Sequence, residues 1–244
     1  MKKKIIITGG TTGIGFACAS YLLKNGYEVI ITGKSEKNLK NAIEKLDNKV
    51  AGYLCDISDL AAIDEFVNSI KEKFGKIDGV FINAGIFKSV SFENTTEELF
   101  DETLNTNFKG SFFTIQKFIP ILNNPASIVL NTSIVVDKAF LNTSIYTASK
   151  AALESICKVL NLELASKGIR INIISPGVTE SPIQQKSGMT DEAIKDLLHH
   201  FSSTSPLGRI VKPDDIAPIL EFLVSEKSIV LRNEKIIVDG GSTL

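Results

Sequence analysis

The sequence predicts an α/β fold in which a doubly wound parallel sheet of about seven strands carries helices on both faces. Two observations support this prediction. Short runs rich in Val, Ile and Leu alternate along the chain with longer stretches of helical periodicity. The short runs are almost continuously apolar, as in strands that are buried on both faces. Alternation of strand and helix favours right-handed βαβ crossovers, which generate parallel sheets.

The individual elements follow from the same two patterns. The expected strands are residues 4–8, 28–33, 50–55, 79–83, 127–132, 170–175 and 235–238. The expected helices lie near residues 14–25, 36–46, 59–74, 96–121, 147–167 and 214–225. Thr95 and Glu98 form a capping-box pattern at one helix start. Further expected terminal residues are the N-caps Ser35, Ser58 and Thr190 and the left-handed glycines Gly26 and Gly168.

No linker-like segment divides the 244 residues, so we expect one domain over residues 1–244. One segment, 177–212, separates the strand at 170–175 from the helix at 214 and contains no strand pattern. So long an excursion within one domain usually has a function. We therefore expect a substrate lid at about residues 178–212.

Composition excludes several classes of protein. The net charge is −1, which gives no broad attraction to nucleic acid or to an anionic membrane. No apolar stretch approaches the roughly 18 residues of a membrane span, and the run after Lys4 ends too early for a signal peptide. The three cysteines are scattered and indicate reduced thiols, with no metal-ligand spacing. We expect a cytoplasmic protein that binds no metal, no membrane and no nucleic acid.

A glycine-rich turn joins the first expected strand to the first expected helix. It reads Gly9-Gly10-Thr11-Thr12-Gly13-Ile14-Gly15. Glycines let the backbone approach a pyrophosphate, which the free N–H groups of the helix N-terminus then bind. The spacing G-x3-G-x-G differs from the G-x-G-x-x-G of ordinary dinucleotide sites. A plain structural turn is the alternative, but the position at the first strand–helix junction favours a dinucleotide site.

The end of the second expected strand bears on the choice of cofactor. An NAD-selective site usually has an acidic residue there, which binds the ribose 2′-OH. This chain instead has Lys34 and Ser35. A carboxylate would repel a 2′-phosphate, whereas Lys34 attracts it. We therefore expect NADP(H) rather than NAD(H); the alternative is that Lys34 is a solvated loop residue.

Tyr146 and Lys150 lie four residues apart at the start of a helical stretch, so their side chains share one face. A free phenol has a pKa of about 10, and a neighbouring cation lowers it. We therefore predict that Lys150 lowers the pKa of Tyr146 and lets it exchange a proton near neutral pH. A Tyr and a Lys at this spacing are usually two unrelated surface residues, so the pair alone is not diagnostic.

Taken together, the motifs resemble those of the short-chain dehydrogenase/reductase family from residue 4 to the end of the chain. The matching positions are Thr8-Gly9-x3-Gly13-Ile14-Gly15, Asn83-Ala84-Gly85, Asn107, Ser133, Tyr146-x3-Lys150 and Pro176-Gly177. Pro206-Leu207-Gly208-Arg209 and Val238-Asp239-Gly240-Gly241 resemble the C-terminal signatures of the family. The resemblance implies a single-domain Rossmann-type oxidoreductase that transfers a hydride between NAD(P) and a carbonyl or secondary alcohol.

The resemblance also implies four catalytic residues. Ser133 would polarise the substrate carbonyl, and Tyr146 would donate or remove the proton. Lys150 would lower the pKa of Tyr146 and hold the nicotinamide ribose, and Asn107 would support a water that relays protons to Lys150. Two alternatives remain: Asn107 stabilises a helix distortion, or Ser133 is an ordinary strand-end hydroxyl.

The same resemblance implies a cofactor cleft. Asp56 and Ile57 would lie by the adenine, although Asp56 is alternatively a solvated loop acid, and Ile174 would flank the nicotinamide. The full set of expected cofactor contacts is Gly9, Thr11, Thr12, Gly13, Ile14, Gly15, Lys34, Ser35, Asp56, Ile57, Asn83, Ala84, Gly85, Tyr146, Lys150, Pro176, Gly177 and Thr179.

Three features depart from the family pattern. Residues 134–142 contain no glycine, where the family commonly has a glycine-bearing loop. Arg232 and Asn233 stand where Thr-Gly is frequent, but Asn tolerates a left-handed backbone, so the turn is expected to survive. Pro218 falls inside the helix from 214, where it removes a hydrogen bond and bends the axis.

A substrate pocket is expected between residues 134–141 and the lid. Its apolar candidates are Val135, Phe140, Leu141, Ile183, Met189, Leu197 and Phe201. Such a lining favours a hydrophobic carbonyl compound. Many members of the family reduce 3-oxoacyl groups on acyl carrier protein, which makes a 3-oxoacyl thioester the leading subclass. Lys167 could meet that acidic partner, whereas residues 123–126 are neutral.

Two other functions share some of these features. A non-catalytic NADP(H) sensor would bind the cofactor on the same fold but would not need Ser133, Tyr146 and Lys150. A Rossmann-like methyltransferase would have a similar glycine turn but no use for the Tyr–Lys pair. His199 and His200 lack metal-ligand spacing and are interpreted as surface residues of the lid. The resemblance further implies a homo-oligomer, a homotetramer or a dimer.

Overall fold

The computed structural model describes residues 2–244, and its seven strands form one parallel sheet in the order β3-β2-β1-β4-β5-β6-β7. The order reverses between β1 and β4, as in doubly wound folds. The strands are β1 (Lys4–Ile7), β2 (Glu28–Gly33), β3 (Ala51–Leu54), β4 (Ile77–Ile82), β5 (Leu122–Asn131), β6 (Ile169–Pro176) and β7 (Lys235–Val238). All seven predicted strands are confirmed, and the largest shift is at β5, which begins earlier than expected.

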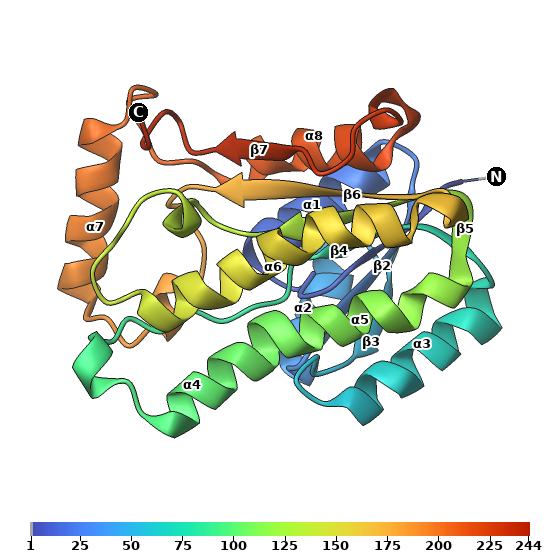
Figure 1. Ribbon diagram of the computed structural model, residues 1–244, viewed down its shortest axis with the longest axis horizontal. Coiled ribbons are helices and arrows are strands. Elements are labelled where there is room, and N and C mark those ends of the chain that lie inside the picture. Colours follow the sequence, from blue (N-terminus) through green and yellow to red (C-terminus); the bar gives the residue numbers. More distant parts are fainter. Residues whose placement is uncertain (1) are drawn as a thin grey trace.

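Helices cover both faces of the sheet (Figure 1). They are α1 (Gly13–Lys24), α2 (Glu36–Lys45), α3 (Leu60–Phe74), α4 (Glu97–Leu104), α5 (Ser111–Phe118), α6 (Ser144–Glu163), α7 (Asp191–Thr204) and α8 (Pro213–Val224). Successive strand residues point to opposite faces, so the core divides into two layers. Ile6 packs with the side chains of α3, α5 and α6, whereas Ile5 and Ile7 pack with those of α1 and α8.

The expected helix over 96–121 is divided in the structure. α4 ends at Leu104, a π-helical turn spans Asn105–Gly110, and α5 continues from Ser111. Gly110 meets the backbone oxygen of Ile57 so closely that a side chain would collide with it. Apolar periodicity continues through such a turn, because the turn adds only one residue to the helical path. The apolar pattern therefore does not show the distortion, which was expected only as an alternative role for Asn107.

Two predicted helix caps are wrong by one residue. Asp59 rather than Ser58 caps α3, and its Oδ1 accepts a hydrogen bond from the N–H of Ala61 at 2.9 Å. Thr96 rather than Thr95 caps α4, because the Thr95 hydroxyl donates to a backbone oxygen instead. Neighbouring hydroxyl and carboxyl groups compete for the same backbone donors, so composition alone does not choose between them. The caps Ser35 and Thr190 are confirmed.

The left-handed backbone expected at Gly26, Gly168 and Asn233 is confirmed. Gly26 and Gly168 adopt φ values of 85° and 69°, and Asn233 adopts 58°, so the turn before β7 forms without glycine. The axis of α8 continues past Pro218 to Val224. Cys18, Cys55 and Cys157 are buried free thiols.

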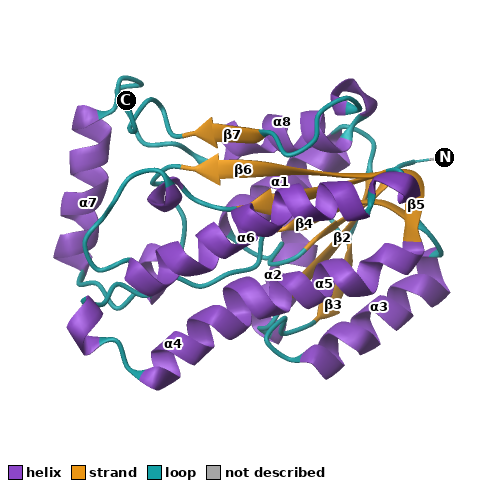
Figure 2. Cartoon of the chain, viewed as in Figure 1, coloured by secondary structure: helices purple, strands orange, loops and turns teal. Residues whose placement is uncertain are grey.

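The segment between β6 and α8 contains no strand within the described chain, as expected. It consists of a 3₁₀ turn at Gln184–Lys186 and helix α7, and Thr179 pairs with Val211 at its base. His199 and His200 are exposed on α7. Figure 2 shows α7 standing beyond the arrowheads of β6 and β7, where the loops gather. Over residues 2–244, no helix is both long and apolar enough to cross a membrane, and no cluster of metal-ligating side chains forms.

Candidate active site

A cleft of about 690 Å³ opens at the carboxyl ends of the strands. Ligand sites in open parallel sheets lie at this edge, where the strand order reverses. The glycine turn, the loops after β2, β4, β5 and β6, the start of α6 and the predicted lid segment all contribute to its wall. The cleft therefore brings together nearly all of the residues that the sequence placed at a site.

The glycine turn closely approaches neighbouring backbone. Gly9 has a φ of 63°, and a Cβ there would lie 2.9 Å from the Cα of Ala84. Gly13 has a φ of 54° and begins α1, whose N-cap residue Thr12 makes no side-chain capping bond. The first N–H groups of α1 are consequently free to bind an anionic group. This cradle fits the pyrophosphate of a dinucleotide.

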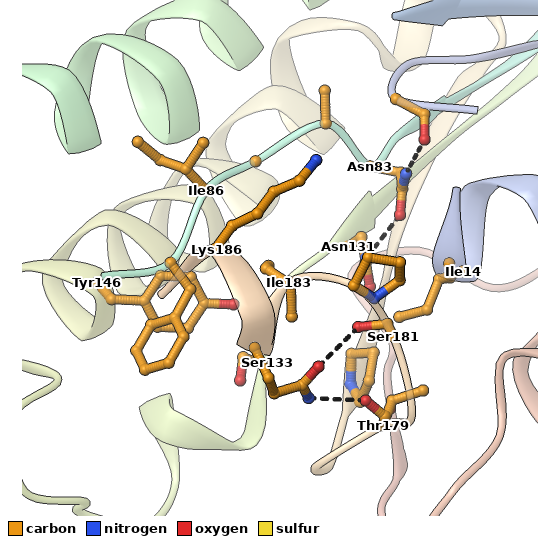
Figure 3. A pocket seen from close by; sticks show the side chains of 18 of the residues that line it. Ile14, Asn83, Ile86, Asn131, Ser133, Tyr146, Thr179, Ser181, Ile183 and Lys186 are labelled. Atoms are coloured by element: carbon orange, nitrogen blue, oxygen red, sulfur yellow. Dashed lines mark hydrogen bonds between the residues drawn. The ribbon is translucent and has the colours of Figure 1, made fainter. Parts of the chain in front are cut away.

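The turn is fixed to β4 by hydrogen bonds that the sequence did not reveal. The Thr8 hydroxyl accepts from the N–H groups of Asn83 and Ala84, both at 3.0 Å. The Asn83 amide donates to the backbone oxygens of Thr8 and Gly9 at 2.9 and 3.1 Å. Asn131 at the end of β5 donates to Asn83 Oδ1 at 2.9 Å (Figure 3). These bonds hold the ends of β1, β4 and β5 in one arrangement.

One polar atom in this arrangement lacks a partner. Asn131 Oδ1 is buried and accepts no hydrogen bond within residues 2–244, although Asn131 lines the cleft. A buried amide oxygen without a donor costs about 1–3 kcal/mol. A ligand that brings a donor into the cleft would remove this cost, which fits a cofactor site.

The predicted adenine end of the cleft contains Lys34, Ser35, Asp56 and Ile57, and all four line it. Lys34 is exposed and makes no ion pair among the described residues. The Ser35 hydroxyl accepts from the N–H of Asn38 as the cap of α2. Asp56 accepts from the N–H and hydroxyl of Ser58 at 3.0 and 2.8 Å, so it is held in a turn rather than freely solvated.

Tyr146 and Lys150 both point into the cleft from the first turns of α6. The Lys150 ammonium lies 5.7 Å from the centre of the Tyr146 ring and donates to the backbone oxygen of Asn131 at 2.8 Å. Ser133 lies two residues after the end of β5 and faces Tyr146 (Figure 3). Asn131 and Ser133 from the end of β5 thus meet Tyr146 and Lys150 from α6 at one point of the cleft.

Burial dominates the ionisation of this group. Burial raises the pKa of Tyr146 to about 12, and its hydrogen bond with Ser133 opposes that shift. Burial lowers the pKa of Lys150 to about 8, and the charge of Glu154 opposes it. The predicted lowering of the Tyr146 pKa by Lys150 is therefore wrong for this structure. The ammonium lies over the ring and is bonded to Asn131, and removal of the phenol from water outweighs its attraction.

Asn107 lies in the π-helical turn and is fully buried. Its Oδ1 accepts from the N–H of Ile86 at 2.8 Å, and its amide donates to the Ile86 oxygen at 2.9 Å and to the Ser149 hydroxyl at 3.0 Å. These bonds connect the distorted helix, the loop after β4 and α6. They agree with the alternative that Asn107 stabilises a helix distortion, and they do not test a role in proton relay.

Two expected cofactor contacts lie outside the cleft. Ile174 is fully buried in the core layer of α1 and α8, and its backbone oxygen accepts from the N–H of Thr132 just after β5. Gly15 lies beneath the turn, where its missing side chain makes room for the Asn83 amide. Pro176, Gly177 and Thr179 do line the cleft, together with the remaining residues expected at the turn and after β4.

The opposite end of the cleft is largely apolar. All seven predicted pocket residues line it, with Leu141 at the exposed rim. Phe140 and Phe201 pack with ring centres 5.8 Å apart, so the loop after β5 contacts the lid. Phe87 was not among the predicted residues, and its ring packs edge-on against that of Tyr146 with the ring centres 5.0 Å apart. Its position two residues after Asn83-Ala84-Gly85 was the available signal.

The predicted lid segment also contacts the loop after β4 and the glycine turn. The N–H of Ser89 donates to the Ser187 oxygen at 2.9 Å, and the Lys88 ammonium donates to the Lys186 oxygen at 3.0 Å. At the glycine turn, Ser181 lies within 3.2 Å of the position that a Cβ of Gly13 would take. Ser181 is a second cleft residue that the sequence analysis did not single out.

Comparison with known proteins agrees with this geometry. A family model described as enoyl-(acyl carrier protein) reductase matches residues 9–243. A 3alpha-hydroxysteroid dehydrogenase of Mediterraneibacter gnavus is 33% identical over 99% of this chain and 98% of its own length. A 3-oxoacyl-(acyl-carrier-protein) reductase of Thermotoga maritima is 34% identical over 98% of this chain and 97% of its own.

Solved structures match equally well along the chain. A short-chain dehydrogenase/reductase of Brucella melitensis superposes with a TM-score of 0.91 at 28% identity and covers 99% of both chains. A short-chain dehydrogenase of Burkholderia cenocepacia, solved in complex with NADP, gives a TM-score of 0.90 at 28% identity, over 99% of this chain and 98% of the other. The chain belongs to the short-chain dehydrogenase/reductase family and is an oxidoreductase acting on carbonyl or CH–OH groups.

Proposed function

We propose that this oxidoreductase uses NADP(H) and that Ser133, Tyr146 and Lys150 are its catalytic residues. The observation that carries the proposal is their convergence in the cleft that the glycine turn also lines. When bound there, the nicotinamide supplies a hydride to the carbonyl carbon, or takes one from the alcohol. The protein supplies the position of the substrate, the proton and the electrostatic surroundings.

Each catalytic residue has one task in the direction of reduction. The Ser133 hydroxyl donates a hydrogen bond to the carbonyl oxygen and holds it beside Tyr146. Tyr146 gives its phenolic proton to that oxygen as the carbon gains its hydride, so that carbonyl, hydride and proton together yield the alcohol. The Lys150 ammonium stabilises the phenolate that remains, and a proton from solvent restores the phenol.

The test is the rate of NADPH oxidation with a carbonyl substrate. Tyr146→Phe should lower kcat by about 10²-fold or more, the usual scale of a lost acid/base group, with the dissociation constant for NADPH unchanged. Tyr21→Phe, at a partly buried tyrosine of α1 that does not line the cleft, is the matched control and should retain full activity. Full turnover in the Tyr146 variant would contradict the assignment. A wild-type protein that binds NADPH and reduces nothing would favour the sensor.

The preference for NADP(H) is supported by the ammonium of Lys34 directly after β2, which is exposed and makes no ion pair within residues 2–244, and by the absence of a carboxylate at that position. Lys34→Asp should shift the ratio of kcat/KM for NADPH over NADH towards NADH by about tenfold or more, since an attractive charge is replaced by a repulsive one. Lys37→Asp, three residues further along on α2, makes the same change of charge away from the cleft. An unchanged ratio in the Lys34 variant would remove the NADP(H) preference.

For the substrate, we propose a carbonyl compound with an apolar body that enters under the lid at residues 178–212. The apolar lining at Phe87, Phe140 and Phe201 supports this class. The named relatives act on a steroid and on a 3-oxoacyl group, which both fit it. Rates with acetoacetyl thioesters, steroid ketones and sugars would decide among them, and no rate on any thioester would exclude the 3-oxoacyl subclass.

We further propose a homotetramer in the cytoplasm, with a dimer as the alternative assembly. Apolar side chains on the outer faces of α4 and α6 support self-association: Phe100, Val159 and Leu162 are 46%, 47% and 81% exposed. Light scattering at micromolar concentration measures the mass directly, and a monomer would contradict the proposal.

A further inference from the structure

A carboxylate lies behind the catalytic residues, outside the cleft that they line. Glu154 follows Lys150 by four residues on α6, and Lys150 follows Tyr146 by four, so the three share one face of the helix. The Glu154 side chain is only 15% exposed and is not among the cleft-lining residues. A nearly buried charge is costly unless it is paired and hydrogen-bonded, so its partners are informative.

Both carboxylate oxygens of Glu154 have partners on the sheet. Oε1 accepts from the Thr132 hydroxyl at 2.8 Å, and Oε2 accepts from the Lys235 ammonium on β7 at 2.8 Å. Thr132 stands between Asn131, whose backbone oxygen accepts from Lys150, and Ser133. The bond from Thr132 to Glu154 therefore ties the strand end that carries Ser133 to the helix that carries Tyr146 and Lys150.

The charges around Glu154 also act on Lys150. Lys235 is shared between Glu154 and Asp137, at 2.8 and 2.6 Å, so the group contains two carboxylates and one ammonium and is negative overall. The other elements packed against Lys150 present neutral groups to it, Asn131 from β5 and Asn107 from the π-helical turn. Burial lowers the pKa of Lys150 to about 8, and Glu154 is the charge that opposes this shift.

We propose that Glu154 is a positioning residue of the active site, which fixes Ser133 relative to Lys150 and keeps the buried Lys150 ammonium protonated. The inference rests on the proposed function only for its effect on turnover, because the charge of Lys150 is a property of the protein itself. A purely structural bridge between α6 and β7 would stabilise the fold equally well. It would leave the ionisation of Lys150 unchanged, and this difference separates the two interpretations.

The decisive variant is Glu154→Gln, which keeps an oxygen for Thr132 and removes the charge. The first measurement is an NMR titration of lysine side chains in the cofactor-free protein, with the Lys150 signal assigned through its absence in Lys150→Met. The Lys150 pKa should fall by roughly one unit in Glu154→Gln, about tenfold in the ionisation constant. Glu163→Gln, an exposed position on the same helix, is the matched control and should leave the titration unchanged.

The second measurement is the pH profile of kcat for carbonyl reduction. The alkaline limb, where Lys150 loses its proton, should move to lower pH in Glu154→Gln by the same amount. Thr132→Val retains the charge of Glu154 but loses the hydrogen bond to it. This variant should therefore lower kcat without shifting the alkaline limb of the pH profile. Lys235→Met removes the cation that is paired with Glu154, and should move the alkaline limb to higher pH. A general loss of stability would not shift the limb in this direction.

Identical Lys150 titrations in the wild type and Glu154→Gln would overturn the electrostatic half of the proposal. An unchanged kcat in Thr132→Val, with the fold verified by circular dichroism, would overturn the positioning half. If the wild type shows no NADPH-linked turnover at all, the proposed function fails, while the titration still decides whether Glu154 sets the charge of Lys150.

Discussion

Lys150 is expected to cost the protein stability, and its removal tests this directly. The side chain is 4% exposed, and its pKa falls from the ordinary 10.5 to about 8. At 1.4 kcal/mol per tenfold change, this difference is about 3 kcal/mol of penalty for the charged form at neutral pH. Lys150→Met keeps most of the side-chain volume but loses the bond to Asn131, which is worth about 2 kcal/mol because its donor is charged. The variant should therefore be more stable by about 1 kcal/mol while it loses catalytic activity.

The stability difference between Lys150→Met and the wild type should depend on pH in one direction. Below pH 8 the lysine is charged in both folded and unfolded chains, so the wild type bears the full penalty. Between pH 8 and 10.5 the folded chain releases its proton before the unfolded chain does, so wild-type stability rises with pH. The advantage of Lys150→Met should shrink through that window and be lost above it.

Urea denaturation at pH 7, 9 and 10.5, followed by circular dichroism, measures these differences. At pH 7 the gain of about 1 kcal/mol corresponds to a rise in Tm of roughly 2–4 °C for a chain of this size. Lys158→Met, on the exposed side of the same helix, controls for the loss of a lysine and should change little. A Lys150→Met variant that is less stable than the wild type at pH 7, or a gain independent of pH, would refute the reasoning.

Two further predictions concern residues away from the catalytic group. Asn161 is buried between α6 and β6, where it donates to the Cys157 and Ile171 oxygens at 2.9 and 2.8 Å and accepts from the Ile171 N–H at 3.0 Å. Asn161→Ala should lower the free energy of unfolding by about 3 kcal/mol, since these backbone groups lose their partners; a loss below about 1 kcal/mol in urea titration would contradict this. Gly13→Ala should cost about 1 kcal/mol, because φ is 54° and the new Cβ would lie 3.2 Å from Ser181. Calorimetric titration should also show weaker NADPH binding by Gly13→Ala, and unchanged affinity would argue that the turn does not hold the cofactor.

Local patterns were sufficient for the sheet and for much of the cleft. The apolar runs predicted all seven strands, because the central strands of a parallel sheet are covered on both faces and are therefore mostly apolar. The glycine turn and the Tyr146–Lys150 spacing were legible because each works through neighbours in the chain. The apolar pattern did not predict the break in the helix at Asn105–Gly110. There Gly110 meets the backbone of Ile57, which is far away in sequence.

The sequence by itself determined the class of fold, the order of its elements, the family and the set of residues that meet in the cleft. Only the tertiary structure decided the ionisation of that set. The pKa of Tyr146 is raised rather than lowered because packing removes the phenol from water. Burial lowers the pKa of Lys150, and the charge of Glu154 opposes that shift. Glu154 is in turn bonded to Lys235, 81 residues away. Burial and charge–charge distance are properties of the packed chain, and no pattern along the sequence encodes them.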